Sequence, residues 1–211
     1  MNLPALYAVV DQHTAVRCGW TVPALARALL AGGARLIQLR ATASGSGQLL
    51  AWCDDLVAAA RPHGARVMVN DRADIALLAG AGGVHVGQTD LEPAAIRRQL
   101  PSGAVVGIST HSPSEVDRSA REPVSYVAVG PVYPTATKRT NRAPVGLELV
   151  RYAARAQPRP VVAIGGITLE RAPEVLAAGA SAVAVVSDLL HGGDPGRRAA
   201  AYAELPSAEP K

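Results

Sequence analysis

Phenylalanine is missing from the sequence, and aromatic residues make up only 3% of its 211 residues. Hydrophobic residues nevertheless reach 49%, so the core must be built mainly from Ala, Val, Leu and Ile. Small and β-branched side chains of this kind suit close packing of helices on a sheet. This length and composition suffice for one domain with a sizeable core. We expect residues 1–211 to form a single domain, with a short disordered tail at 204–211.

Cysteine is also scarce. Cys18 and Cys53 are isolated and lack the spacing of metal ligands, which favours a reduced, cytoplasmic protein. No uncharged apolar run reaches the roughly 18 residues of a membrane span, and the opening MNLPALYAVVD has no basic region typical of a signal peptide. The sequence therefore indicates no membrane partner.

Lysine occurs at two positions, Lys138 and Lys211, so arginine supplies 19 of the 21 basic residues. The net charge of +4 is spread thinly and the aromatics are too few for base stacking, which argues against nucleic acid as a partner. Small phosphorylated ligands explain a mild basic excess better. The sequence does not fix an oligomeric state, and a homo-oligomer is compatible with it.

Strand-like and helix-like segments alternate along the whole chain. Nearly continuous apolar runs, typical of parallel strands buried on both faces, occupy residues 6–11, 36–40, 66–70, 83–87, 105–110, 126–132, 161–166 and 182–187. Each is followed by a helical pattern, and several of these patterns end in glycine. Eight such units without a domain break predict the α/β class and a single (β/α)8 TIM barrel. The rival, an open doubly wound sheet, usually has a G-x-G-x-x-G after its first strand, and this sequence has none.

Active sites of such barrels lie at the carboxyl ends of the strands, and the residues there are unusually polar. Candidate residues are Gln38, Arg40, Asn70, Asp71, His85, Gln88, Asp90, Ser109, Thr110, His111, Thr135, Thr137, Lys138, Gly165, Gly166, Val186 and Ser187. Each has an ordinary structural interpretation when taken alone. As a set they predict one polar mouth.

Asp71 and Asp90 follow neighbouring strands of the predicted barrel. Two nearby carboxylates repel each other unless a proton or a cation lies between them. Oxygen ligands without His or Cys favour Mg²⁺, which keeps waters and completes its shell with substrate phosphate. The competing interpretation is that Asp71 caps the following helix and that Asp90 stabilises a turn or caps the helix after it.

Two further groups of residues suggest chemistry. Gly165 and Gly166, with Val186 and Ser187 opening the last helix, resemble a phosphate cup, because barrels often bind phosphate after strands seven and eight; tight turns and a helix cap are the alternative. His111 is a candidate acid–base group, although it could instead cap a helix. His85 is expected more often to be a core residue than a substrate contact.

The stretches IQLR, VNDRADIALLAGAGGVHVGQTDL, GISTHS, GPVYPTATK, PVGLE and AIGGIT resemble those of the thiamine phosphate synthase family, in order and over nearly the whole chain. The resemblance implies a (β/α)8 transferase that joins a pyrimidine methyl diphosphate to a thiazole phosphate, giving thiamine phosphate and pyrophosphate. It implies a dissociative reaction assisted by Mg²⁺, with Asp71 and Asp90 as metal ligands. By the same resemblance Gln38, Arg40, Asn70, Ser109 and Lys138 hold the pyrimidine diphosphate, and Thr135, Thr137, Gly166, Val186 and Ser187 hold the thiazole phosphate. Lys138, with Ser109 and Arg40, would act in catalysis by stabilising the departing pyrophosphate.

One position departs from the family pattern. The family usually has Q-x-R-x-K after the second strand, whereas this chain has Thr42 in place of the lysine. Arg40, Lys138 or Arg139 could compensate for that missing charge. Two alternatives stay open: a thiazole tautomerase-like paralogue that uses His111, and a non-catalytic binder of a thiamine-pathway phosphate.

Overall fold

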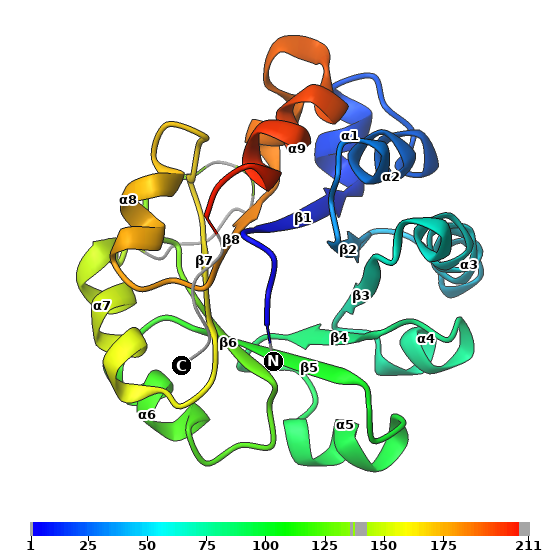
Figure 1. Cartoon of the computed structure of the whole chain (residues 1–211). Coiled ribbons are helices and arrows are strands. Elements are labelled where there is room, and N and C mark those ends of the chain that lie inside the picture. Colours follow the sequence, from blue (N-terminus) through cyan, green and yellow to red (C-terminus); the bar gives the residue numbers. More distant parts are fainter. Residues whose placement is uncertain (1, 136, 138–142, 207–211) are drawn as a thin grey trace.

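The computed structural model describes residues 2–135, 137 and 143–206, and in it the strands close into a parallel barrel in sequence order. Figure 1 looks along this barrel, with the helices arranged around it. The strands are β1 (Leu6–Asp11), β2 (Leu36–Arg40), β3 (Arg66–Asn70), β4 (Gly83–Val86), β5 (Val105–Thr110), β6 (Tyr126–Val129), β7 (Val161–Ile164) and β8 (Ala182–Val185). β8 pairs in parallel with β1 and closes the ring. The predicted α/β class and (β/α)8 barrel are confirmed.

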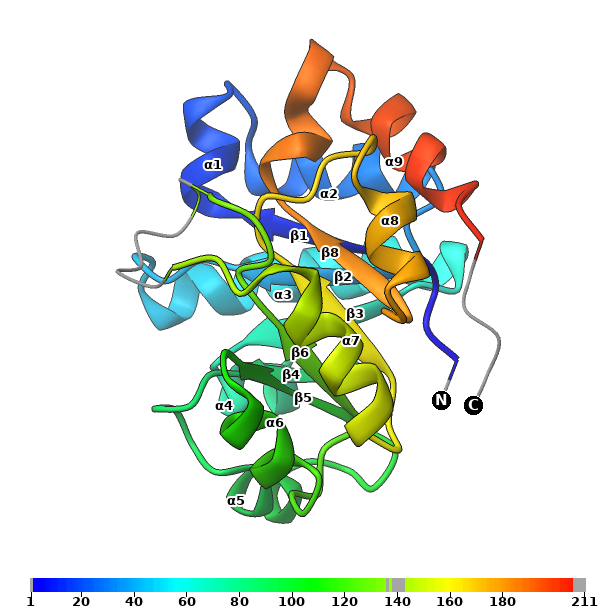
Figure 2. The same cartoon turned by 90° about the vertical axis from the view of Figure 1, so that its left-hand side faces the viewer.

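The helices follow the strands and pack on the outside of the ring (Figures 1 and 2). They are α1 (Gln12–Arg17), α2 (Val22–Ala31), α3 (Ser46–Ala60), α4 (Ala73–Leu78), α5 (Pro93–Gln99), α6 (Pro113–Ser119), α7 (Gly146–Ala156), α8 (Ala172–Ala177) and α9 (Pro195–Ala203), with 3₁₀ segments η1 (Arg61–His63) and η2 (Ser187–Gly193). Thr21 shows how they begin, because its side chain accepts a hydrogen bond from the amide of Ala24.

Two local expectations need correction. Helix α1 was not predicted, because Gln12–Arg17 has no clear apolar period; it forms because Asp11, the last residue of β1, caps its first turn. Ser187 does not open the last helix. It begins η2, which is kinked at His191 and Gly192, and α9 starts only at Pro195.

The core has two parts. The larger lies between the strands and the helices and consists mainly of Val, Leu, Ile and Ala, as the composition predicts. The smaller fills the inside of the barrel and includes Tyr7, Met68 and Tyr126. The rings of Tyr7 and Tyr126 meet edge to face, with centroids 5.9 Å apart. In a chain without phenylalanine, tyrosines supply the bulk at this place and bring hydroxyl groups into it.

Gly107 in β5 makes room for one of these tyrosines. A Cβ atom at this position would lie 2.1 Å from Cζ of Tyr126 and 2.4 Å from its hydroxyl oxygen. Any side chain here would therefore displace the ring. The glycine inside the apolar run VVGIST has a packing function, as is typical of glycine within a strand.

Among the described residues, no helix is long and apolar enough to span a membrane. Of the expected tail, Glu204 and Leu205 still donate backbone hydrogen bonds to α9, and residues 207–211 lie outside the described part. The single-domain boundary and the disordered tail stay predictions.

Candidate active site

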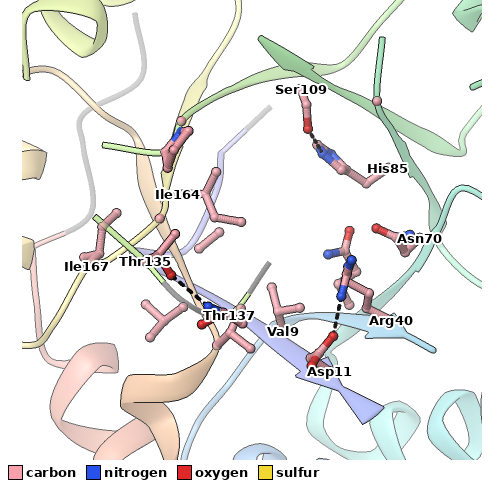
Figure 3. A pocket seen from close by; sticks show the side chains of 18 of the residues that line it. Val9, Asp11, Arg40, Asn70, His85, Ser109, Thr135, Thr137, Ile164 and Ile167 are labelled. Atoms are coloured by element: carbon pink, nitrogen blue, oxygen red, sulfur yellow. Dashed lines mark hydrogen bonds and ion pairs between the residues drawn. The ribbon is translucent and has the colours of Figure 1, made fainter. Parts of the chain in front are cut away.

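A cavity of about 250 Å³ opens at the carboxyl ends of the strands. Strand residues that line it include Asp11, Arg40, Asn70 and Ser109, all at or next to the end of their strands. Figure 3 shows these side chains facing a common space, with Thr135, Ile164 and Ile167 across from Arg40 and Asn70. The cavity therefore lies where the barrel architecture predicts the chemistry.

Most of the predicted site residues line this one cavity. They are Gln38, Arg40, Asn70, Asp90, Ser109, His111, Thr135, Thr137, Gly166, Val186 and Ser187. His85, Gln88 and Gly165, noted among the strand-end residues, line it as well. Asp71 does not line it, although its neighbour Asn70 does. Lys138 falls outside the described residues.

Arg40 is held by a buried carboxylate. Its guanidinium lies 2.5 Å from Asp11, whose side chain is only 2% exposed. The same carboxylate accepts hydrogen bonds from the amide and the hydroxyl of Thr14, at 2.9 and 2.6 Å. Asp11 thus connects the cavity wall to the first turn of α1 and fixes the direction in which Arg40 points. Sequence reasoning missed Asp11; the available signal was its place at the end of the first apolar run.

Asp71 adopts a left-handed backbone conformation, with φ of 62°, which is uncommon for a residue other than glycine. Its amide donates to the carbonyl of His85 at 2.8 Å, and the side-chain amide of Asn70 donates to its carboxylate at 2.6 Å. The helix-cap interpretation does not explain it, because the cap position of α4 is Arg72. Backbone strain of this kind is concentrated at functional sites.

Asp90 closes the turn that follows β4. Its carboxylate accepts the amide hydrogen of Gly87 at 2.8 Å, so the turn interpretation describes a real contact. Asp90 also lines the cavity and is exposed to solvent, which leaves carboxylate oxygen accessible there. The turn contact and a ligand role are therefore compatible.

The described residues contain no group of three or more His, Cys, Asp or Glu side chains that could hold a metal ion. This does not count against Mg²⁺, because Mg²⁺ is usually held by one or two carboxylates together with waters and substrate phosphates. Asp71 and Asp90 follow the adjacent strands β3 and β4 and offer oxygen donors only. The donor chemistry fits this ion.

His85 and Ser109 face each other across adjacent strands. Nε2 of His85 lies 2.8 Å from the hydroxyl of Ser109, and Nδ1 lies 2.8 Å from the hydroxyl of Tyr126. The imidazole also stacks on the ring of Tyr126 at 5.6 Å. His85 is therefore both a hydrogen-bonded residue of the barrel interior and a residue of the cavity wall. The core and substrate-contact interpretations are compatible.

His111 is anchored through one ring nitrogen. Nδ1 lies 2.5 Å from the carbonyl oxygen of Gly130, and because a carbonyl can only accept, Nδ1 carries the proton. The backbone amide of His111 donates to the carboxylate of Glu115, while the amide of Glu115 donates to Ser112. Ser112, not His111, is the helix cap of α6. Within the described part of the chain, no hydrogen bond of the other ring nitrogen, Nε2, accompanies this contact.

The opposite wall consists of the loops that follow β6, β7 and β8. The hydroxyl of Thr137 donates to that of Ser187 at 3.3 Å, and the amide of Thr137 donates to the hydroxyl of Thr135 at 3.3 Å. These contacts bring residues of the β6 loop to the start of η2, so Thr137 and Ser187, two of the residues that the family resemblance assigns to the thiazole phosphate, lie together.

Gly165 and Gly166 are needed for packing between these loops. Their φ angles are 103° and 64°. A Cβ atom would lie 2.6 Å from Cα of Pro131 at the first position and 2.5 Å from the carbonyl oxygen of Pro134 at the second. Both glycines therefore have a structural role, because the absence of a side chain allows the β6 loop to lie against the β7 loop.

The charges on the described cavity wall do not favour an anion by themselves. The charged residues among them are Asp11, Asp90 and Arg40, and Arg40 is already paired with Asp11. Thr42 is exposed and does not line the cavity. A polyanionic ligand would therefore need positive charge beyond that of the described wall, from a bound cation or from the β6 loop.

The thiamine monophosphate synthase family model matches residues 6–189. The chain is 38% identical to the thiamine-phosphate synthase of Koribacter versatilis, over 97% of both chains. It is 47% identical to the thiamine-phosphate synthase of a Mycobacterium species, covering 81% of this chain and 79% of the relative. A solved structure of thiamine phosphate pyrophosphorylase from Pyrococcus furiosus superposes with a TM-score of 0.83, at 28% identity, covering 93% of this chain and 92% of that one.

The chain belongs to the thiamine monophosphate synthase family. The resemblance on which the sequence analysis depended is confirmed, and so is the expectation of an enzyme of the transferase class. The roles of individual residues, the metal ion and the oligomeric state are not tested by these similarities and stay predictions.

Proposed function

We propose that this chain joins 4-amino-2-methyl-5-(diphosphooxymethyl)pyrimidine to a thiazole phosphate, carboxylated or not, giving thiamine phosphate and pyrophosphate, with CO₂ released as well when the thiazole is carboxylated. The observation that carries the proposal is a single cavity with two polar walls. One holds Arg40, Asn70 and Ser109, and the other holds Thr135, Thr137 and Ser187. Two phosphorylated substrates that must meet need two such regions with a space between them.

The strand wall is assigned to the pyrimidine diphosphate, with Gln38, Arg40, Asn70, Ser109 and Lys138. Because Asp11 fixes the guanidinium of Arg40, Arg40 meets the diphosphate with little reorganisation, which is how charge stabilisation in a site becomes effective. Lys138 adds a compact point charge. The loop wall is assigned to the thiazole phosphate, with Thr135, Thr137, Gly166, Val186 and Ser187.

Asp71 and Asp90 would hold Mg²⁺, which would supply positive charge to the diphosphate. In the proposed reaction the C–O bond breaks first and its electron pair leaves with the diphosphate. The amino group of the pyrimidine stabilises the resulting methyl cation, and the thiazole nitrogen donates its lone pair to form the C–N bond. The chain positions the substrates and stabilises charge; it supplies no nucleophile.

The proposal is tested by incubating the purified protein with both substrates and Mg²⁺. We expect equimolar thiamine phosphate and pyrophosphate, and loss of both products when a chelator removes the ion. Exchange between thiazole tautomers without pyrophosphate would support the tautomerase alternative through His111. Binding without any reaction would support the non-catalytic alternative.

Lys138 has a matched control in the other lysine of the chain. Lys138→Ala should lower turnover, because the loss of a charge-assisted contact raises the activation free energy by about 1.5–3 kcal/mol. Its folding stability should be nearly unchanged. Lys211→Ala should change neither. Equal turnover in the two variants would reject the role assigned to Lys138.

A further inference from the structure

A chain of hydrogen bonds crosses the inside of the barrel and ends on the cavity wall at both sides. It connects Ser109, His85, Tyr126, Tyr7 and Gln38 in that order. The successive distances are 2.8, 2.8, 3.0 and 3.3 Å. The residues at its two ends, Ser109 and Gln38, are both assigned to the pyrimidine diphosphate. The mechanism proposed above gives no part to the two tyrosines.

The chain can run in only one direction at a time, because each tyrosine hydroxyl has a single hydrogen to donate. Tyr126 donates to Tyr7, and Tyr7 donates to Oε1 of Gln38. Tyr126 must then accept from His85, which places a proton on Nδ1. In the neutral imidazole, which carries a single ring proton, Nε2 then accepts the hydroxyl hydrogen of Ser109.

Burial of the two tyrosines keeps this chain of hydrogen bonds intact. Tyr7 is 2% exposed and Tyr126 is fully buried. Burial raises the pKa of both phenols, so each hydroxyl keeps its hydrogen. Gly107 leaves the space that the ring of Tyr126 occupies, because a Cβ atom there would overlap the ring. A buried hydroxyl without a partner is costly, so each member holds its neighbours in place.

We propose that Tyr7 and Tyr126 are positioning residues that fix the hydrogen-bonding polarity of the cavity wall. With Oε1 of Gln38 held by Tyr7, the side-chain NH₂ group of Gln38 is turned to donate toward the ligand. With its hydrogen given to His85, the hydroxyl of Ser109 presents lone pairs as an acceptor. A wall with one donor and one acceptor suits a ring that carries an acceptor nitrogen and an amino group, as an aminopyrimidine does.

This inference rests on the proposed function for its substrate, but its first test does not need activity. Nitrogen-15 NMR of histidine-labelled protein distinguishes protonated from unprotonated ring nitrogens, and the His85 signals are assigned by their loss in His85→Asn. We expect a protonated Nδ1 and an unprotonated Nε2 in the ligand-free protein. Any other protonation pattern overturns the proposal, whether or not the protein makes thiamine phosphate.

The second test is kinetic and uses Tyr7→Phe and Tyr126→Phe. Each should raise the KM for the pyrimidine diphosphate or lower kcat/KM for it by about tenfold, with the KM for the thiazole phosphate unchanged. A purely structural loss would lower the amount of active enzyme and move neither KM. Tyr152→Phe is the matched control, since its hydroxyl bonds Asp117 on α6 and it does not line the cavity.

If the wild-type protein is active and both variants behave like Tyr152→Phe, the two tyrosines have no positioning role and the proposal is wrong. If the wild-type protein makes no thiamine phosphate, the proposed function fails, and the NMR result alone decides on the hydrogen-bond chain.

Discussion

The two walls of the cavity are built differently. The strand wall is fixed by its own contacts, with Arg40 at 2.5 Å from buried Asp11 and Ser109 at 2.8 Å from His85. The loop wall has long side-chain contacts of 3.3 Å, from Thr137 to Ser187 and within the β6 loop. Its backbone is nevertheless tied down, because the amide of Tyr133 donates to the carbonyl of Gly165 at 3.0 Å.

The difference shows how the binding energy of each substrate is used. A wall whose side chains are already held loses little conformational freedom on binding. Hydroxyl groups that make weak mutual contacts can exchange them for a phosphate at little cost. The strand wall is therefore suited to the group whose charge changes in the reaction, and the loop wall to a group that only has to be held.

The largest expected effect comes from breaking the ion pair behind the strand wall. Asp11→Ala leaves Arg40 without its buried partner and removes the cap of α1, so it should destabilise the protein by about 3–5 kcal/mol. Asp74→Ala is the control, because Asp74 pairs with Arg72 at the same 2.5 Å but is 54% exposed, and exposed pairs contribute about 0–1 kcal/mol. Urea unfolding measures both variants; equal midpoints would mean that burial of Asp11 adds nothing.

A smaller effect is expected from the loop wall. Gly166→Ala would place a Cβ atom 2.5 Å from the carbonyl oxygen of Pro134, pushing the β6 and β7 loops apart. Gly192→Ala is a matched control, since Gly192 also has positive φ but no atom of the described residues lies within 4 Å of a new Cβ. In both variants the free energy of unfolding should fall by about 1–2 kcal/mol, because alanine is strained in a left-handed backbone conformation.

In Gly166→Ala the free energy of unfolding should fall by a further ~1–3 kcal/mol because of the close contact with Pro134. Only this variant should raise the KM for the thiazole phosphate. Thermal unfolding and steady-state kinetics of both variants give the comparison. If the KM for the pyrimidine diphosphate rises instead, the assignment of the two walls is reversed.

The smallest effect on stability is expected at position 42. Thr42 is exposed, so Thr42→Lys should change the free energy of unfolding by less than about 0.5 kcal/mol. Because Arg40 is paired with Asp11, it is a poor replacement for the missing charge. The new lysine should therefore strengthen binding of the pyrimidine diphosphate by about 1.5–3 kcal/mol, seen as a lower KM. An unchanged KM would mean that Lys138 or Arg139 already compensates, or that the substrate is different.

Much of the fold was predictable because burial on both faces leaves a direct trace in a strand. The runs 36–40 and 105–110 match β2 and β5 to the residue. The carboxyl-terminal ends of β6, β7 and β8 were predicted too late in the sequence, because apolar and glycine residues continue past the last hydrogen bond between the strands. Helix α1 was missed, since its stability comes from a cap and from packing on α2 rather than from its own pattern.

The candidate site divides in the same way. Gln38, Arg40, Asn70 and Ser109 could be named from the sequence, because strand ends of a parallel barrel converge by construction. Asp11 and the two tyrosines could not, because their importance depends on partners 29 to 119 residues away. The packing reason for Gly165 and Gly166 became visible only when Pro131 and Pro134 were placed beside them.

The sequence alone determined the barrel, because secondary structure and burial are encoded locally in the order of apolar runs and helical patterns. It also determined at which end of the barrel the polar residues meet. Only the tertiary structure decided which side chains pair across the strands, and therefore which way Arg40, Gln38 and Ser109 face. Hydrogen bonds and ion pairs act over about 3 Å, a distance that no spacing along the sequence specifies until the chain has folded.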